Sequence, residues 1–313
     1  MTFHIKLETD KEAANIAERN HLEKWGNENK TVYKSGKVGN FDGITFDIKD
    51  KKMKIVCSLH KAYIKIVLEQ DRLDNSGLFT ISEAHRSLNA LFNHIGIEKE
   101  HAEIKYFEIG LNLPTKYEAV EYIKPMISIT SGVRDIDKAW FEDANFEENR
   151  QKTTRKVKTI KKVFKAYDKE HEQAQKHREQ PTGEHILRIE TMYRRQNIPV
   201  LDFFSNEHIN RLKQCFYDDW ARVEFKRDIT ADKGVHSGQI ENAKNILLFG
   251  RENYLQRAKA DYKAGVLSER KYRTIQEFVR DWNSNKHKYR MLPSEYETEY
   301  RDILTKIFNV AKY

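Results

Sequence analysis

Residues 103–113 have the sequence EIKYFEIGLNL, in which polar and apolar side chains alternate. A period of two residues predicts a β-strand, and Pro114 predicts where that strand ends. Residues 185–195, HILRIETMYRR, alternate in the same way. Such alternation is typical of antiparallel sheets with one face on a core, so we expect both strands in one antiparallel sheet. The first strand is expected to place these residues on one face: Ile104, Tyr106, Glu108, Gly110 and Asn112.

Other segments extend this picture on both sides of the two strands. Residues 3–7 and 31–40 predict strands, and residues 43–59 predict a hairpin that turns at Asp50. Residues 11–25 and 82–95 predict helices, the second capped by Ser82. Residues 115–123 predict a short helix, and residues 133–151 a surface loop. The basic run at 157–172 fits a helix and a strand equally well, and residues 180–184 have turn chemistry.

The last third of the chain changes character, because apolar residues there recur with helical spacing. Helices are predicted over residues 205–227, 237–249, 252–264, 268–283 and 294–313. We therefore expect an α+β fold, with an antiparallel sheet flanked by helices in residues 1–204 and a helical C-terminal domain in residues 205–313.

Composition excludes several classes of protein. The 313 residues are 39% hydrophobic and 33% charged, which suffices for a core but leaves no window apolar enough for a transmembrane helix. The first residues lack the apolar run of a signal peptide. Cys57 and Cys215 form neither a zinc spacing nor a disulfide framework, which fits a reducing cytoplasm.

Positive charge is concentrated in one segment, which we call the basic ribbon, residues 150–169. It holds nine Lys or Arg and one acid, Asp168, so its net charge equals the +8 of the whole chain. A chain that is neutral outside one basic ribbon indicates a polyanion-binding protein. The alternative is a solvated basic helix face or a linker. The ribbon has no wide apolar face, which argues against membrane binding.

Glu108 and Glu190 each lie in the middle of a predicted strand, where a carboxylate is disfavoured. If the two strands are neighbours, both carboxylates can point at one place, and their hard oxygens suit Mg²⁺ or Mn²⁺. The alternative is that Glu190 pairs with Arg188 or Arg194, and Glu108 with Lys105, on an exposed sheet face.

Tyr167 follows the ribbon and is flanked by Lys165 and Lys169. A phenol is a poor nucleophile near neutral pH unless a cation stabilises its phenolate form. Because the chain has fifteen tyrosines, composition alone favours a core or surface role for Tyr167 over a catalytic one. The chain has no GxxxxGK[ST], GxGxxG, GxSxG, CxxC or HExxH motif, which argues against P-loop, dinucleotide-binding, serine-hydrolase and zincin chemistry. His171 and His185 flank the segment and are candidates to assist.

Three segments in this order, residues 102–117 (AEIKYFEIGLNLPTKY), 163–173 (VFKAYDKEHEQ) and 185–195 (HILRIETMYRR), together resemble the gene II/X family of phage and plasmid replication initiation proteins. The helical tail at 238–282 is similar to that family's tail as well. The resemblance covers about residues 100–285 and implies a degenerate form of the replication-initiator/relaxase endonuclease fold.

The resemblance also implies a function. Such a protein starts rolling-circle DNA replication by nicking one origin strand through a 5′-phosphotyrosine intermediate and later rejoining it. Matched by position, Tyr167 is the nucleophile and Lys169 the lysine that lowers the phenol pKa or neutralises the phosphate. Glu108, Glu190 and Glu172 match the acids that would hold Mg²⁺ or Mn²⁺, with Glu108 standing where the family usually has Asp. The implied setting is the cytoplasm of a bacterial host, with origin DNA, a host helicase and a polymerase as partners.

Basic side chains are the candidate DNA contacts. The ribbon and the second strand supply Arg155, Lys156, Lys158, Lys161, Lys162, Lys165, Arg188 and Arg194. Residues 268–279 add Arg270, Lys271 and Arg273, in a segment that fits a helix-turn-helix or a helical hairpin that only packs. A non-catalytic DNA-binding replication or regulatory protein is the alternative function.

Overall fold

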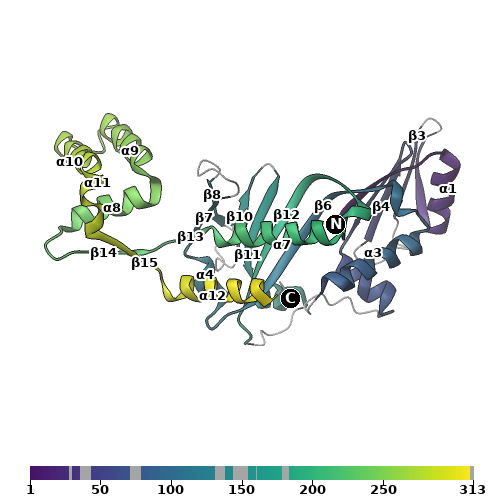
Figure 1. Ribbon diagram of the computed structural model, residues 1–313. Coiled ribbons are helices and arrows are strands. Elements are labelled where there is room, and N and C mark those ends of the chain that lie inside the picture. Colours follow the sequence, from purple (N-terminus) through teal and green to yellow (C-terminus); the bar gives the residue numbers. More distant parts are fainter. Residues whose placement is uncertain are drawn as a thin grey trace. The chain divides into compact units, whose positions relative to one another are not determined.

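The computed structural model describes residues 1–27, 30–35, 44–70, 79–130, 138–143, 154–159, 161–177 and 183–310. They form an α+β fold of two compact units, residues 1–224 with 303–313, and residues 225–302 (Figure 1). The boundary expected after residue 204 differs from this division. Helix α7 (Asn206–Ala221) belongs to the first unit because its Trp220 donates to Thr191 Oγ1 at 2.9 Å inside the sheet core.

Ten strands of the described chain form one sheet in the order β2-β3-β4-β5-β1-β6-β12-β11-β10-β9. Their bounds are β1 Thr2–Lys6, β2 Leu22–Asn27, β3 Lys30–Ser35, β4 Ile44–Lys49, β5 Lys52–Cys57, β6 Ala102–Pro114, β9 Glu142–Asp143, β10 Thr154–Lys158, β11 Lys162–Asp168 and β12 Ile186–Pro199. Neighbours pair antiparallel, as the alternation predicted.

Helices pack against one face of this sheet. Figure 1 shows α3 over the N-terminal strands and α7 across β11 and β12. Trp220 of α7 meets Phe164 of β11 edge to face, with ring centroids 5.9 Å apart. The helices of this unit are α1 Asp10–Arg19, α2 Leu59–Ala62, α3 Ile81–Ile95, α4 Ala119–Ile123, α5 Lys169–His177, α6 Val200–Phe203, α7, and the end of α12 (Glu295–Val310). A small sheet of β13 (Val223–Phe225), β7 (Met126–Thr130) and β8 (Lys138–Trp140) completes it.

Local sequence explains most element ends. Asp50 and Lys51 both have positive φ, the geometry of a two-residue hairpin turn. Helix α3 is capped by Thr80, whose side chain and that of Glu83 form a capping box, so the cap predicted at Ser82 is wrong by two residues. Gly96 ends α3 with φ 77, a left-handed conformation that favours glycine.

Two of the predicted segments differ from the structure. The helix predicted over 11–25 ends at Arg19, because the buried amide of Asn20 donates to the carbonyls of Ile16 and Ile95 and turns the chain into β2. Residues 138–143 form short strands within the predicted loop. The remainder of that loop, part of the 31–40 strand and part of the 180–184 turn lie outside the described residues.

The ambiguous basic run is a strand pair followed by a helix, β10–β11 and then α5. The alternation predicted for 103–113 is interrupted at Lys105, which is the extra residue in the pairing with β1, since Tyr106 pairs with Thr2 and Ile104 with Phe3. The register with β12 shifts at the same place, between Arg194 and Ile198. This bulge places Ile104 and Phe107 together in the buried core, so Ile104 does not share the face of Glu108.

The second unit, residues 225–302, is helical with one β-ribbon. It comprises β14 Asp228–Ala231, α8 Ser237–Phe249, α9 Arg251–Lys263, α10 Glu269–Arg280, α11 Trp282–Asn285, β15 Tyr289–Leu292 and the start of α12. The ribbon β14–β15 was not predicted, because four-residue strands are too short for alternation to show. Its core gathers Ala243, Ile246, Val279, Trp282 and Tyr289.

A buried acid fixes the start of α12 within the second unit. The side chain of Glu297 is fully buried and pairs with Arg227 and with Arg301, the latter at 2.9 Å. Burial opposes ionisation of Glu297, but the two arginines outweigh it and hold its pKa below the usual 4.5. This contribution to stability is therefore present above pH 4.5 and is lost as the pH falls through the lowered pKa.

Replacing Glu297 by alanine is expected to destabilise this unit by about 2–4 kcal/mol, because two arginines lose a buried partner. Glu269→Ala is the matched control, since Glu269 forms the same (i, i+4) pair with Arg273 in the open, and it should cost less than about 0.5 kcal/mol. Hydrogen exchange of peptides from α8 and α10 measures both. Equal protection in the two variants would contradict the assignment.

Candidate active site on the polar face of the sheet

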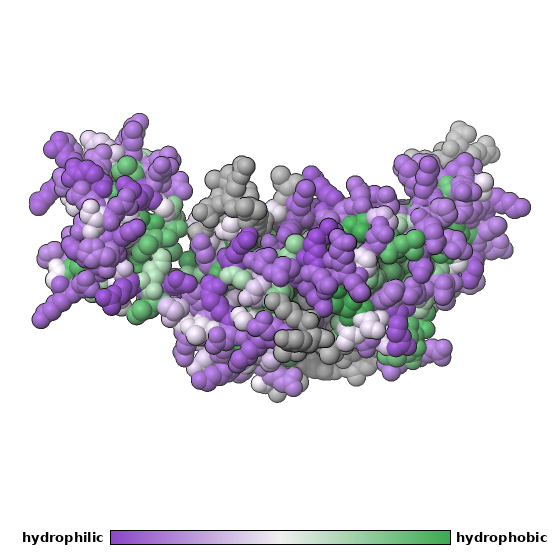
Figure 2. All heavy atoms as spheres, viewed as in Figure 1, coloured by the Kyte–Doolittle hydropathy of each residue, from purple (hydrophilic) through white to green (hydrophobic). Residues whose placement is uncertain are grey.

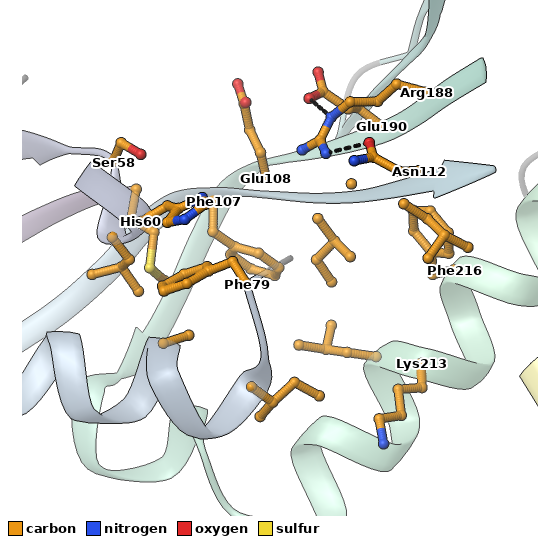
Figure 3. A pocket seen from close by; sticks show the side chains of 18 of the residues that line it. Ser58, His60, Phe79, Phe107, Glu108, Asn112, Arg188, Glu190, Lys213 and Phe216 are labelled. Carbon is orange, nitrogen blue, oxygen red and sulfur yellow. Dashed lines mark hydrogen bonds and ion pairs between the residues drawn. The ribbon is translucent and has the colours of Figure 1, made fainter. Parts of the chain in front are cut away.

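Strands β6, β12 and β11 lie side by side, and the face turned away from the helices carries polar side chains. In register, Lys165 pairs with Glu190 and Glu190 with Gly110, while Tyr167 pairs with Arg188 and Arg188 with Asn112. Directly paired residues project from the same face, so these side chains meet on adjacent strands. Figure 3 shows Glu108, Glu190, Arg188 and Asn112 on one side of β6, and Phe107 and Phe216 on the other.

Glu190 is at the centre of this cluster. Its Oε1 accepts from the Tyr167 hydroxyl at 2.9 Å and from Arg188 Nε at 2.7 Å, and Lys165 Nζ lies 3.6 Å from its Oε2. Only 7% of Glu190 is exposed. Burial opposes ionisation, but Arg188, Lys165 and Tyr167 outweigh it and lower the pKa of Glu190 below its usual value. The site therefore contains a charged, buried carboxylate next to a phenol.

Arg188 is held in place by its neighbours. Its Nη1 donates to Asn112 Oδ1 at 2.8 Å, and its guanidinium lies where a β-carbon on Gly110 would be. A side chain at position 110 would displace this guanidinium, so Gly110 is favoured by the close approach of Arg188 and not by a positive φ. The pairing of Glu190 with Arg188, one of the alternatives considered from sequence, is present. The alternative pair of Glu108 with Lys105 is not, because Lys105 contacts Glu103.

Tyr167 has a raised pKa. Burial and the charge of Glu190 raise it, and Arg188 lowers it less. Lys165 lies over the ring, 5.9 Å from its centroid. The expectation that Lys169 lowers the phenol pKa is not met, since the pKa is raised and Lys169, almost fully buried, bonds Glu172 at 2.7 Å.

The three carboxylates proposed as metal ligands do not all come together. Glu108 and Glu190 are diagonal neighbours on one face, which fits the predicted convergence. Glu172 instead pairs with Lys169 at the start of α5. Within the described ranges no three His, Cys, Asp or Glu residues are grouped to hold a metal ion. Two carboxylates with a substrate phosphate are a common arrangement for Mg²⁺, and Lys165 Nζ lies 3.6 Å from Glu190 Oε2, beyond hydrogen-bond distance, so Glu108 and Glu190 fit such an ion.

Tyr106 is a site residue that the sequence reasoning missed. Its hydroxyl bonds Glu108 on the same polar face, and burial followed by this bond raises its pKa. The sequence could have indicated this, because Tyr106 lies two residues before Glu108 in an alternating strand and so projects from the same face. Two other tyrosines, Tyr193 and Tyr217, have surroundings that differ from those of Tyr167. Tyr193 stacks on Phe107 in the core, and Tyr217 stacks on Phe308 of α12.

The candidate DNA-contacting residues of the first unit lie in different parts of the sheet. Lys165, Arg188 and Arg194 lie on β11 and β12 and face the polar side, and Lys161 is exposed at the turn before β11. Lys162 was expected among the DNA contacts, but its side chain projects from the helix-covered face and pairs with Asp219 at 2.5 Å. Arg155, Lys156 and Lys158 lie in β10, and their side chains are outside the described part of the chain, as are Arg150 and Lys152.

In the second unit, α9 and α10 form the predicted helix pair. Arg270, Lys271 and Arg273 are exposed on α10, and Arg273 pairs with Glu269. Val279 is buried, and Tyr272 stacks on Tyr262 at 5.0 Å, so the apolar face packs as expected. This arrangement fits a helix-turn-helix and a packing hairpin alike.

No protein-family model matches the chain, and no curated protein matches it. Over the described ranges, no helix combines the length and apolar character needed to cross a membrane. Figure 2 shows hydrophilic residues over most of the viewed face, with hydrophobic residues in small groups.

Proposed function

We propose that the chain is a DNA nicking and joining enzyme that initiates rolling-circle replication, with Tyr167 as its nucleophile. The single observation that carries this proposal is the 2.9 Å hydrogen bond from the Tyr167 hydroxyl to the buried carboxylate of Glu190. A phenol needs a base within hydrogen-bond reach to attack a phosphodiester, and Glu190 is charged and in reach. The resemblance to the gene II/X initiators supports the same reaction.

The steps follow from the positions of the side chains. The Tyr167 oxygen attacks the phosphorus while its proton passes to Glu190 Oε1. The bond from phosphorus to the 3′ oxygen breaks, and that oxygen leaves as a hydroxyl with a proton from solvent. Arg188 and Lys165 are placed to offset the phosphate charge. Since the phosphotyrosine conserves the ester, rejoining needs no nucleotide cofactor.

A divalent cation, Mg²⁺ or Mn²⁺, would be held by Glu108 and Glu190 and would supply charge neutralisation at the phosphate. Lys169 and Glu172 line the same cavity as an ion pair. We therefore assign Lys169 to the phosphate backbone rather than to the phenol, and Glu172 to orienting Lys169.

A second candidate is a non-catalytic DNA-binding replication or regulatory protein. Two observations favour this second candidate. Arg188 and Lys165 already neutralise the Glu190 carboxylate, and the pKa of the Tyr167 phenol is raised. In this case Tyr167 and Glu190 would only stabilise the sheet, and the basic side chains would bind DNA without breaking it.

A covalent-adduct experiment separates the two candidates. The protein is incubated with Mn²⁺ and a pool of random single-stranded oligonucleotides, and adducts that survive a denaturing gel are sequenced and mapped by mass spectrometry. We expect a nucleotide on the peptide that contains Tyr167, and a shared sequence 3′ to the junction. DNA binding without any adduct would favour the second candidate, and an adduct on another tyrosine would overturn the assignment of Tyr167.

A further inference from the structure

One cavity of about 890 Å³ joins the polar face to the helix-covered face of the sheet. It is lined by Tyr167, Arg188 and Glu190 at one end and by Leu111, Phe204 and Leu212 at the other. Its volume is in the range of ligand sites, and like them it combines an apolar wall with a few polar groups. The site of the proposed nick therefore lines the polar part of a cavity whose other part is lined largely by apolar side chains.

The cavity lies beside β6 because β1 pairs with only the first part of that strand. Strand β1 pairs with β6 from Ala102 to Tyr106, whereas β12 pairs with it as far as Pro114. Strand β5 turns into α2 after Cys57, so the residues after Tyr106 line the gap from 107 to 112 on both faces. Figure 3 shows this stretch of β6 crossing the cavity between the polar and the apolar side chains.

Flat aromatic surface lines the apolar end. His60 and Phe79 are stacked almost parallel, with centroids 4.5 Å apart and an interplanar angle of 9°, and both line the cavity. Both are half-buried, so they retain accessible surface. Unpaired nucleobases bind proteins by stacking on such rings while their phosphates contact cations. Here Arg188 and Lys165 line the polar part of the same cavity.

We infer that this cavity takes one unstacked nucleobase of single-stranded DNA, next to the phosphate held at Arg188. The inference rests on the proposed function and adds to it the part of the substrate that the enzyme selects. The aromatic pair supplies the stack, the apolar wall excludes water, and the exposed edge of β6 offers main-chain groups to the base. Arg188 and Lys165 hold the backbone on either side.

The test measures binding, in a Tyr167→Phe background, so that it does not depend on nicking. Fluorescence anisotropy compares a single-stranded thymidine 12-mer with the same backbone without bases, and a 12-mer carrying one 2-aminopurine reports stacking by quenching. We expect Phe79→Ala to weaken binding of the 12-mer about ten-fold and to relieve the quenching, with no change for the abasic strand. Phe79→Tyr should retain both, because it keeps the ring.

Trp25→Ala is the matched control, since Trp25 is 57% exposed on β2 and does not line the cavity. It should change neither readout, and thermal unfolding confirms that each variant is folded. Equal binding of the abasic strand and the 12-mer to the parent protein would overturn the inference, as would unchanged quenching in folded Phe79→Ala. If the parent protein binds DNA in a base-dependent way but forms no covalent adduct, the base-binding cavity would be supported and the nicking function would be contradicted.

Discussion

Tyr167→Phe is expected to reduce strand nicking by at least about a thousand-fold, because removing a nucleophile removes the covalent route. Phenylalanine keeps the ring and its place beneath Lys165, and it loses only the oxygen that bonds Glu190. The substrate is the sequence recovered from the adduct pool. Nicking and adduct formation are measured in single turnover, and DNA affinity should stay within about two-fold.

Two other tyrosines serve as controls for this substitution. Tyr106→Phe removes the second phenol on the polar face and should leave nicking within about ten-fold of the parent, because Tyr106 bonds Glu108 and not Glu190. Tyr193→Phe should have no effect on nicking, since Tyr193 lies in the core and its hydroxyl has no hydrogen-bond partner among the described residues. Full activity in Tyr167→Phe with loss in Tyr106→Phe would move the nucleophile to Tyr106.

The fold was predictable where the period of the sequence is long and regular. For the strands at 103–113 and 185–195, the sequence predicted the correct face of the sheet for most side chains, since alternation fixes the side to which each side chain points. The bulge at Lys105 was not predictable, because it arises from a shift in pairing with a strand far away in sequence. Likewise, the end of α1 depends on Asn20 reaching the carbonyl of Ile95.

The candidate site shows the same division between local and long-range information. Glu190 and Arg188 are two residues apart in one strand, so their pairing could be inferred. The contact between Tyr167 and Glu190 requires β11 to lie beside β12, and the basic run fitted a helix equally well. Lys162 was misassigned for this reason, because in a strand it must project opposite to Lys165.

Replacing Glu190 by glutamine is expected to slow nicking by about 10²–10⁴-fold, the usual cost of losing a general base. Glutamine has the same shape and can still accept a hydrogen bond from Tyr167, but it cannot take the proton. It also leaves Arg188 and Lys165 without a counter-charge, so stability will fall. Rates are therefore compared well below the melting temperature of the variant.

The pH profile separates a base from a structural ion pair. A base works when deprotonated, and the pKa of Glu190 is lowered from 4.5, so the parent rate should be flat from about pH 5.5 to 8. It should fall only as the pH drops through that lowered pKa. An inflection near pH 6.5 would instead indicate a histidine base, for which His171 and His185 are the nearest candidates along the chain.

Glu108→Gln is the matched control, because Glu108 is exposed on the same face and its carboxylate accepts from Tyr106. It should raise the Mn²⁺ concentration needed for half-maximal nicking while leaving the pH profile flat. A Glu190→Gln variant that nicks at the parent rate would contradict the role of base. If that variant only melted earlier, Glu190 would be a structural ion-pair partner of Arg188, and the non-catalytic function would then account for every contact in the cluster.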